Sequence, residues 1–179
     1  MDKTALAKVI NELLATERRS LLEHFQEATP HITAATYRVW NELKKLAHRD
    51  SDHAARLSAL LGKLHQPERP QPFSQDVGHY HYMTVNHVLK LLIEEKKQHL
   101  AAYDRALAHC ASEPALVGEL EALRADNLAE LLAIEAMEKQ VTRQAAAKGR
   151  PIDVAMSPDL NNAANVVVAS KVLAAAKAK

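Results

Sequence analysis

Cysteine, glycine and long apolar runs are scarce in this sequence, and each scarcity excludes a class of protein. The single cysteine, Cys110, can form neither an internal disulfide nor a cysteine-built zinc site. Four glycines among 179 residues are too few for the many tight turns of a β-sandwich. No segment approaches the run of about 18 apolar residues that a membrane-spanning helix needs. We therefore expect no membrane association.

A strong excess of charge of either sign is also missing. The formal net charge is +1, so nothing suggests a polyanion-binding surface, and nucleic acid is excluded as the expected partner. The N-terminus lacks the apolar stretch and cleavage site of a secretory signal, which favours a cytoplasmic protein. Glycine-rich phosphate loops and the common hydrolase motifs are missing too, so nucleophilic hydrolysis has no support.

Proline and glycine divide the chain into long blocks rich in the strong helix formers Ala, Leu, Glu, Lys and Arg. A proline-containing segment, His65 to Val77, separates the second block from the third, and Ser112-Glu113-Pro114 is typical of a helix start. The four blocks that we predict to be helical are 3–28, 33–64, 79–110 and 113–148. We assign residues 1–150 to one domain, and 151–179 to a small-residue tail that is partly disordered or a short helix.

Each block repeats apolar residues at alternating spacings of three and four, as in Leu6, Ile10 and Leu13. Four such amphipathic helices predict an all-α, four-helix bundle. In every block, polar residues interrupt the apolar repeat near mid-helix. The interrupting residues are Glu17, Asp50, Glu95 and Asn127, with His53, His99 and Glu130 about one turn away and His24 near the end of the first block.

The spacing along each helix places these interruptions at one level. Glu17 and Asn127 lie about 21 Å from the starts of their blocks, and Asp50 and Glu95 about 21–22 Å from the ends of theirs. If the two short turns share one end of the bundle, these four residues form a single layer. That arrangement requires the connection between the second and third helices to run the length of the bundle. An all-antiparallel bundle with a loose loop is the alternative topology.

Carboxylates buried in such a layer must be neutralised, paired or bound to a cation. The oxygen and imidazole ligands suit two divalent ions of iron, manganese or zinc. The candidate metal ligands are Glu17, Asp50, His53, Glu95, His99 and Glu130. Arg124, one turn before Asn127, is the competing cation that the sequence suggests.

The stretches ATERRSLLEHF and AHRDSDHAARLSALLGKL, together with the mid-helix layer, resemble the ferritin-like superfamily, in particular its rubrerythrin-related branch, over residues 5–145. The resemblance implies that Glu17 is the first-helix ligand, that Asp50 and His53 form the second-helix motif with Asp in place of Glu, and that Glu95 is the third-helix ligand. The fourth helix departs from the family pattern, because Arg124-Ala125-Asp126-Asn127 lacks both ligands at the matching spacing.

Two functions follow as hypotheses. The first is a redox protein of the oxidase or ferroxidase type, with two iron or manganese ions held in the core by carboxylates and histidines. The second is a metal-free ferritin-like scaffold that acts through protein association, with Arg124 neutralising the buried carboxylates. A stress or storage role is a third reading, and assembly into a homo-oligomer is left open.

Overall fold

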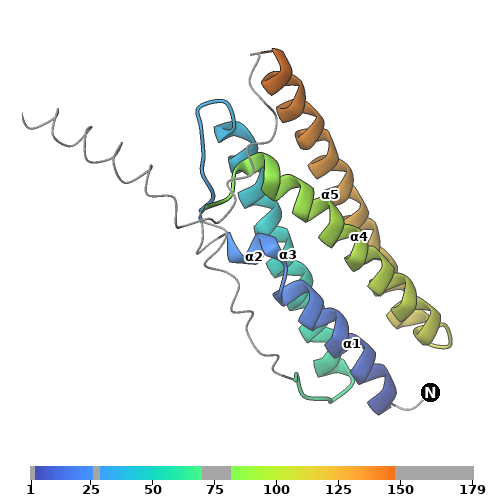
Figure 1. Ribbon diagram of the computed structural model, residues 1–179. Helices are drawn as coiled ribbons and strands as arrows, with labels where there is room; N and C mark the ends of the chain where they lie inside the picture. The colour runs from blue at the N-terminus through green and yellow to red at the C-terminus, as the bar shows by residue number, and fades with distance from the viewer. Residues whose placement is uncertain (1–2, 26–28, 70–81, 148–179) are drawn as a thin grey trace, which may run out of the picture.

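The computed structural model describes residues 3–25, 29–69 and 82–147, and these residues are organised as helices (Figure 1). The five helices are α1 (Lys3–Arg18), α2 (Leu21–His24), α3 (Tyr37–Lys63), α4 (Val85–Cys110) and α5 (Pro114–Ala147). Apart from an isolated bridge between His31 and Thr84, the described residues contain no β-pairing. None of the described helices combines the length and the apolar character that crossing a membrane requires.

The predicted helical blocks agree with α3, α4 and α5 to within several residues, and α5 begins at Pro114, one residue after the predicted start. The prediction of one continuous helix over 3–28 is wrong, because the chain breaks at Arg19-Ser20 between α1 and α2. The predicted tail, 151–179, lies outside the described residues, as does most of the predicted crossover.

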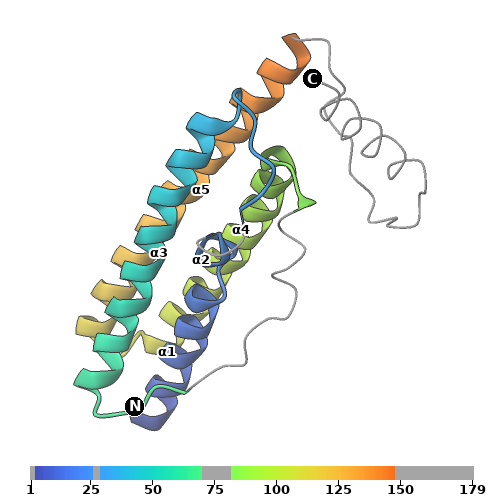
Figure 2. The same ribbon diagram turned by 90° about the vertical axis from the view of Figure 1, so that its left-hand side faces the viewer.

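Two hydrophobic clusters show how the helices run relative to one another. The first joins the start of α1 and the start of α5 to the ends of α3 and α4, and the second joins α2 and the end of α5 to the starts of α3 and α4. Leu6, Ile10, Leu57, Leu61, Ala106 and Leu120 belong to the first cluster, and Leu22, Leu43, Val88, Leu92 and Ile134 to the second. The helices α3 and α4 are therefore parallel, and α1 and α5 run in the opposite direction (Figures 1 and 2).

This topology confirms one prediction and corrects another. Because α3 and α4 are parallel, Lys63 and Val85 lie toward opposite ends of the molecule, as a lengthwise crossover requires, and the all-antiparallel alternative is wrong. The expectation that both short turns share one end is also wrong. The turn between α4 and α5 lies at the start of α1, and the connection from α2 to α3 at the other end (Figure 2). Parallel α3 and α4 place the two turns at opposite ends, because α4 ends where α3 ends. The expectation of a shared end is therefore incompatible with the lengthwise crossover that accompanies it.

Replacement of Leu57 by Ala tests the packing of the first cluster. Leu57 is fully buried, so we expect Leu57→Ala to lower the free energy of unfolding by about 2–5 kcal/mol in urea titrations. Tyr37→Ala is the control, because it removes a larger side chain that is 57% exposed, and we expect it to cost less than about 1 kcal/mol. Equal losses in the two variants would contradict the described core.

Candidate metal centre

A layer of buried polar side chains separates the two hydrophobic clusters. Glu17, Ser20, Asp50, His53, Lys96, His99, Asn127 and Glu130 are each at most 3% exposed. They come from α1, α3, α4, α5 and the break before α2, so each of the four long helices contributes at least one buried polar side chain to the layer. Polar groups buried at this density persist only when they satisfy one another or bind something.

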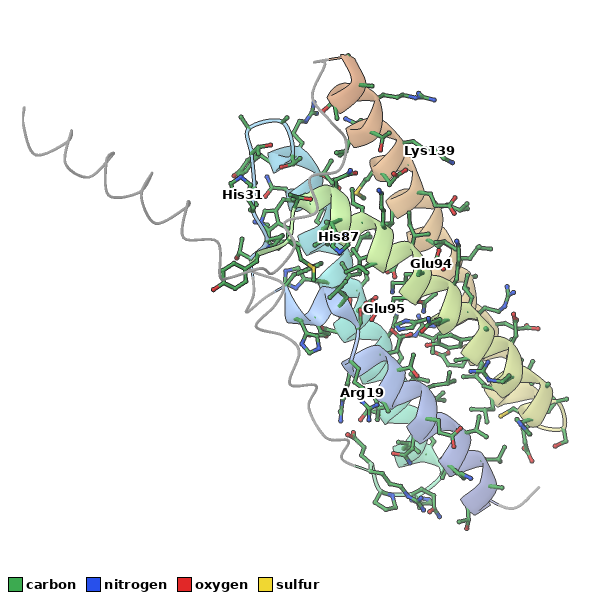
Figure 3. The ribbon with its side chains drawn as sticks, in the orientation of Figure 1. Arg19, His31, His87, Glu94, Glu95 and Lys139 are labelled. Atoms are coloured by element: carbon green, nitrogen blue, oxygen red, sulfur yellow. The ribbon has the colours of Figure 1, made fainter. Side chains whose placement is uncertain are left out.

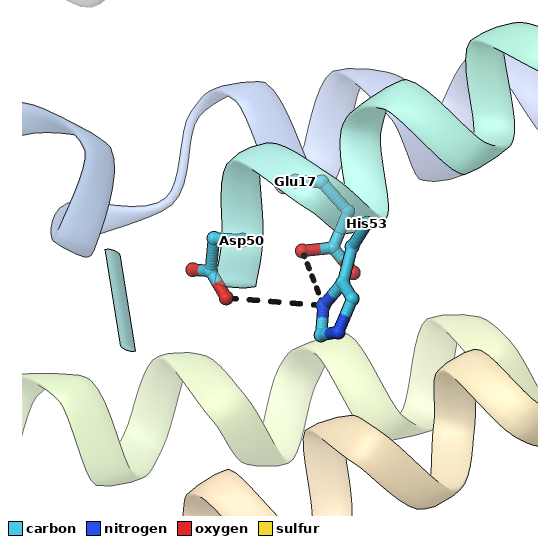
Figure 4. Close-up of side chains that lie close together, drawn as sticks. All are labelled: Glu17, Asp50 and His53. Carbon is cyan, nitrogen blue, oxygen red and sulfur yellow. Dashed lines mark ion pairs between the residues drawn. The ribbon is translucent and has the colours of Figure 1, made fainter. Parts of the chain in front are cut away.

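Glu17, Asp50 and His53 form the tightest group in this layer (Figure 4). One ligand atom from each lies within 4.8 Å of the other two. The Nδ1 atom of His53 is 3.9 Å from Oε2 of Glu17 and 3.9 Å from Oδ1 of Asp50. Ligands that bind one ion at about 2.1 Å stand about 3–4 Å apart, so a small inward shift would bring these three atoms around a single cation.

Two buried polar atoms at this position have no hydrogen-bond partner among the described residues. One belongs to Oε2 of Glu17 and the other to Nδ1 of His99, and the two atoms are 4.0 Å apart. The other oxygen of Glu17 accepts hydrogen bonds from the Tyr103 hydroxyl at 2.7 Å and from Nδ2 of Asn127 at 3.0 Å. An unsatisfied buried acceptor is costly, and a bound cation would satisfy both of these.

The second ring nitrogen of His53, Nε2, lies near a carboxylate. Its Nε2 atom lies 3.8 Å from Oδ2 of Asp126, and that carboxylate pairs with Arg56 at 2.9 Å. A carboxylate behind a histidine favours a proton on the nearer nitrogen and leaves the other nitrogen as an acceptor. Nδ2 of Asn127 contacts that nitrogen, Nδ1, at 3.5 Å, and a metal ion would replace this long contact. Burial lowers the pKa of His53, which also favours the neutral, ligating form.

The break between α1 and α2 is tied to the same layer. The Ser20 hydroxyl caps α2 by accepting from the backbone N–H of Leu22, and it donates to Oδ2 of Asp50. Both oxygens of Glu95 accept from the backbone N–H of Leu21, at 2.9 and 3.0 Å. Glu95 therefore faces α2 (Figure 3), and the structure does not place it among the ligand atoms as the sequence predicted.

Lys96 is the internal cation of the layer. Its Nζ atom contacts Oδ1 of Asp50 at 2.6 Å, Oε2 of Glu130 at 2.7 Å and Oδ1 of Asn127 at 3.0 Å. The prediction that Arg124 neutralises the buried carboxylates is wrong, because Arg124 pairs with Asp104 at the surface at 2.6 Å.

Lys96 was not among the predicted site residues, because it stands in a charged run, Glu94 to Lys97, of the kind found on helix surfaces. Its position carried a signal nevertheless. Lys96 lies four residues after Leu92 and three before His99, so it continues the buried repeat of α4, and Tyr103 continues that repeat one turn further on.

Burial and charge shift the titration of the layer. Burial raises the pKa of Glu130 to about 8 and that of Glu95 to about 7, and it also raises the pKa of Glu17. Burial lowers the pKa of His99 to about 4. Burial alone would lower the pKa of Lys96, but attraction to the surrounding carboxylates outweighs it and raises the pKa above its ordinary value. The layer therefore contains more carboxyl groups than the single ammonium of Lys96 can neutralise.

Comparison with known protein families, with curated proteins and with solved structures finds no match to this chain. The chemistry of the site is therefore derived from its own residues.

Removal of the Lys96 charge tests the balance of the layer. Lys96→Met leaves buried carboxylates without their cation, so we expect it to lower the free energy of unfolding by about 3–5 kcal/mol in chelator-treated protein. Lys97→Met is the matched control, because its side chain is half exposed, and we expect a change within about 0.5 kcal/mol. Two variants of equal stability would show that Lys96 is not enclosed as described.

The shifted pKa values also predict how stability depends on pH. Above about pH 6.5, unfolded carboxyls are ionised while Glu95 and Glu130 in the folded, metal-free protein still hold protons, with pKa values of about 7 and about 8. The folded state then binds more protons, so stability falls as pH rises to about 8, by at most about 1.4 kcal/mol per pH unit for each proton. Below about pH 6.5 the lowered pKa of His99 opposes this trend.

Urea titrations in EDTA between about pH 6.5 and 8 measure the slope. Glu130→Gln removes one of the titrating groups, so this variant should show a shallower decline. Stability that rises through this window would contradict the assignment of raised carboxyl pKa values.

Proposed function

We propose that this chain is a ferritin-like four-helix bundle that binds a divalent metal ion, iron or manganese, and uses it in redox chemistry of the oxidase or ferroxidase type. Glu17, Asp50 and His53 are the proposed ligands, with His99 as the fourth. The observation that carries the proposal is the convergence of three buried ligand atoms within 4.8 Å of one another. Oxygen and imidazole ligands in this combination suit iron, manganese and zinc.

Lys96 changes the expected number of ions from two to one. Its ammonium lies between Asp50 and Glu130, where a second ion would need the same carboxylates. The proposed single metal lies on the Glu17 and His53 side of the layer, and it shares Oδ1 of Asp50 with Lys96. The proposed centre is therefore a metal ion paired with a fixed ammonium.

The residues around the proposed ion have separable roles. Tyr103 and Asn127 hold one oxygen of Glu17 and leave the other directed at the proposed ion. Asp126 lies 3.8 Å behind His53 and favours a proton on Nε2, and the hydrophobic clusters on both sides of the layer exclude bulk water. A bound iron or manganese ion would supply electron exchange with dioxygen or peroxide.

A metal-free scaffold is the second candidate, and the contacts of Lys96 favour it. One buried ammonium that bonds Asp50, Asn127 and Glu130 links α3, α4 and α5 at a single level. Polar contacts of this kind can fix the register of packed helices without doing chemistry. In this reading Lys96 takes the role that the sequence suggested for Arg124, and the protein acts through association.

Metal titration distinguishes the two candidates. We expect Mn²⁺, Co²⁺, or Fe²⁺ under anaerobic conditions to bind with a stoichiometry near one per chain and to raise the melting temperature. An ion at 100 times its dissociation constant stabilises the fold by about 2.7 kcal/mol. His53→Gln should abolish the shift, whereas His109→Gln, which alters an exposed histidine on α4, should leave it unchanged.

Two outcomes would contradict metal binding at this site and favour the scaffold. One is binding of less than about 0.3 metal ion per chain at saturation with no change in melting temperature. The other is a metal-induced rise in melting temperature that persists in His53→Gln. If the metal binds, the rate of Fe²⁺ oxidation in air tests the redox step. That rate should exceed the rate in buffer for the wild type and fall to the buffer rate in His53→Gln.

A further inference from the structure

The helix α5 has apolar residues on two faces, and only one of them packs inside the molecule. Leu116, Leu120, Leu123 and Ile134 lie on the buried face. The opposite face, which we call the outer α5 face, consists of Ala125, Leu128, Ala129, Leu132 and Ala136, all exposed. Leu128 is 39% exposed and Leu132 is 57% exposed, which places them among the few large apolar side chains exposed in the described part of the chain.

The outer α5 face is continuous along the helix. Its residues recur at spacings of three and four, so they form one stripe about 17 Å long from Ala125 to Ala136. Gly118 continues the stripe toward the start of α5, and a β-carbon at that position would meet nothing within 4 Å. Small residues at both ends of a stripe allow another helix to approach closely.

Charges of opposite sign lie at the two ends of the stripe. Glu121 lies before it, and Lys139 and Arg143 lie after it, all exposed. Lys139 projects away from the rest of the helices (Figure 3). Within the described ranges, none of these three side chains forms a salt bridge. They are therefore available to another molecule.

The stripe is complementary to itself when it is reversed. Around a midpoint at Glu130, Leu128 and Leu132 are equally distant on either side. Glu121 and Lys139 are also equidistant from that midpoint, at about 14 Å. Two copies of α5 placed antiparallel about a two-fold axis would thus set leucine against leucine at the centre and glutamate against lysine at both ends.

We propose that the outer α5 face is the interface of a homodimer in which the α5 helices of two copies pair antiparallel. The charge pattern selects a second copy as the occupant, because each charged end meets its opposite twice in such a pair. The two leucines supply the apolar centre, and the charged ends fix the direction of pairing. The proposed ligands Glu17, Asp50 and His53 lie on other helices, and the layer residues Asn127 and Glu130 lie on the buried face of α5, away from the proposed interface.

Sedimentation equilibrium of the full chain over about 1–500 µM tests the proposal. We expect a reversible dimer for the wild type and a monomer of unchanged helicity for Leu132→Glu. Glu121→Lys alone and Lys139→Glu alone each place like charges together twice, so each should weaken dimerisation by about tenfold. The double variant should restore the wild-type affinity. Lys45→Glu, an exposed change on α3, is the control and should leave the affinity unaltered.

Three results would overturn the proposal. One is a monomer at every concentration, which includes the case in which residues 148–179 cover the face. Another is a dimer that persists in Leu132→Glu. The third is a double charge exchange that fails to restore the affinity lost in the single variants, because only pairing of the face with itself predicts that rescue.

Discussion

The structure depends on one buried ammonium. Lys96 is fully buried, and its three contacts reach Asp50 on α3 and Asn127 and Glu130 on α5. Removing an ammonium from water costs several kcal/mol, and only close carboxylates of good geometry recover that cost. The packing of α3, α4 and α5 at this level is therefore an electrostatic arrangement rather than an apolar one. With Glu17 also buried nearby, the acidic side chains outnumber the one ammonium, and the proposed metal ion would balance this excess.

The polar layer and the path of the chain depend on each other. The break between α1 and α2 exposes backbone N–H groups in the core, and Ser20 and Glu95 accept from them. Ser20 also bonds Asp50, so the same contacts that end α1 hold a proposed ligand in place. Apolar clusters above and below isolate the layer from water, which strengthens every charge interaction inside it. The same few side chains therefore stabilise the fold and position the proposed ligands.

The sequence was sufficient for the helices and for the level of the layer, and insufficient for its internal pairing. Apolar spacing identified α3, α4 and α5. The axial distances of Glu17, Asp50 and Asn127 agree with one layer when they are measured from the end at which α1 and α5 begin and α3 ends, although the expected position of the turns was wrong. Spacing could not choose between Glu95 and Lys96, because both continue a three-four repeat after Leu92. That choice depends on which neighbouring acids are close enough to compensate a buried charge, a three-dimensional property. For the same reason Arg124, adjacent to the layer in sequence, pairs instead with Asp104.

A diffraction measurement at the manganese absorption edge, on crystals of the full chain grown with Mn²⁺, tests the central claim most directly. We expect one anomalous peak per chain in the core, about 2.1 Å from ligand atoms of Glu17, Asp50, His53 and His99, with Lys96 still bonded to Asp50 and Glu130. A core without a peak, or two core peaks with Lys96 displaced, would contradict it.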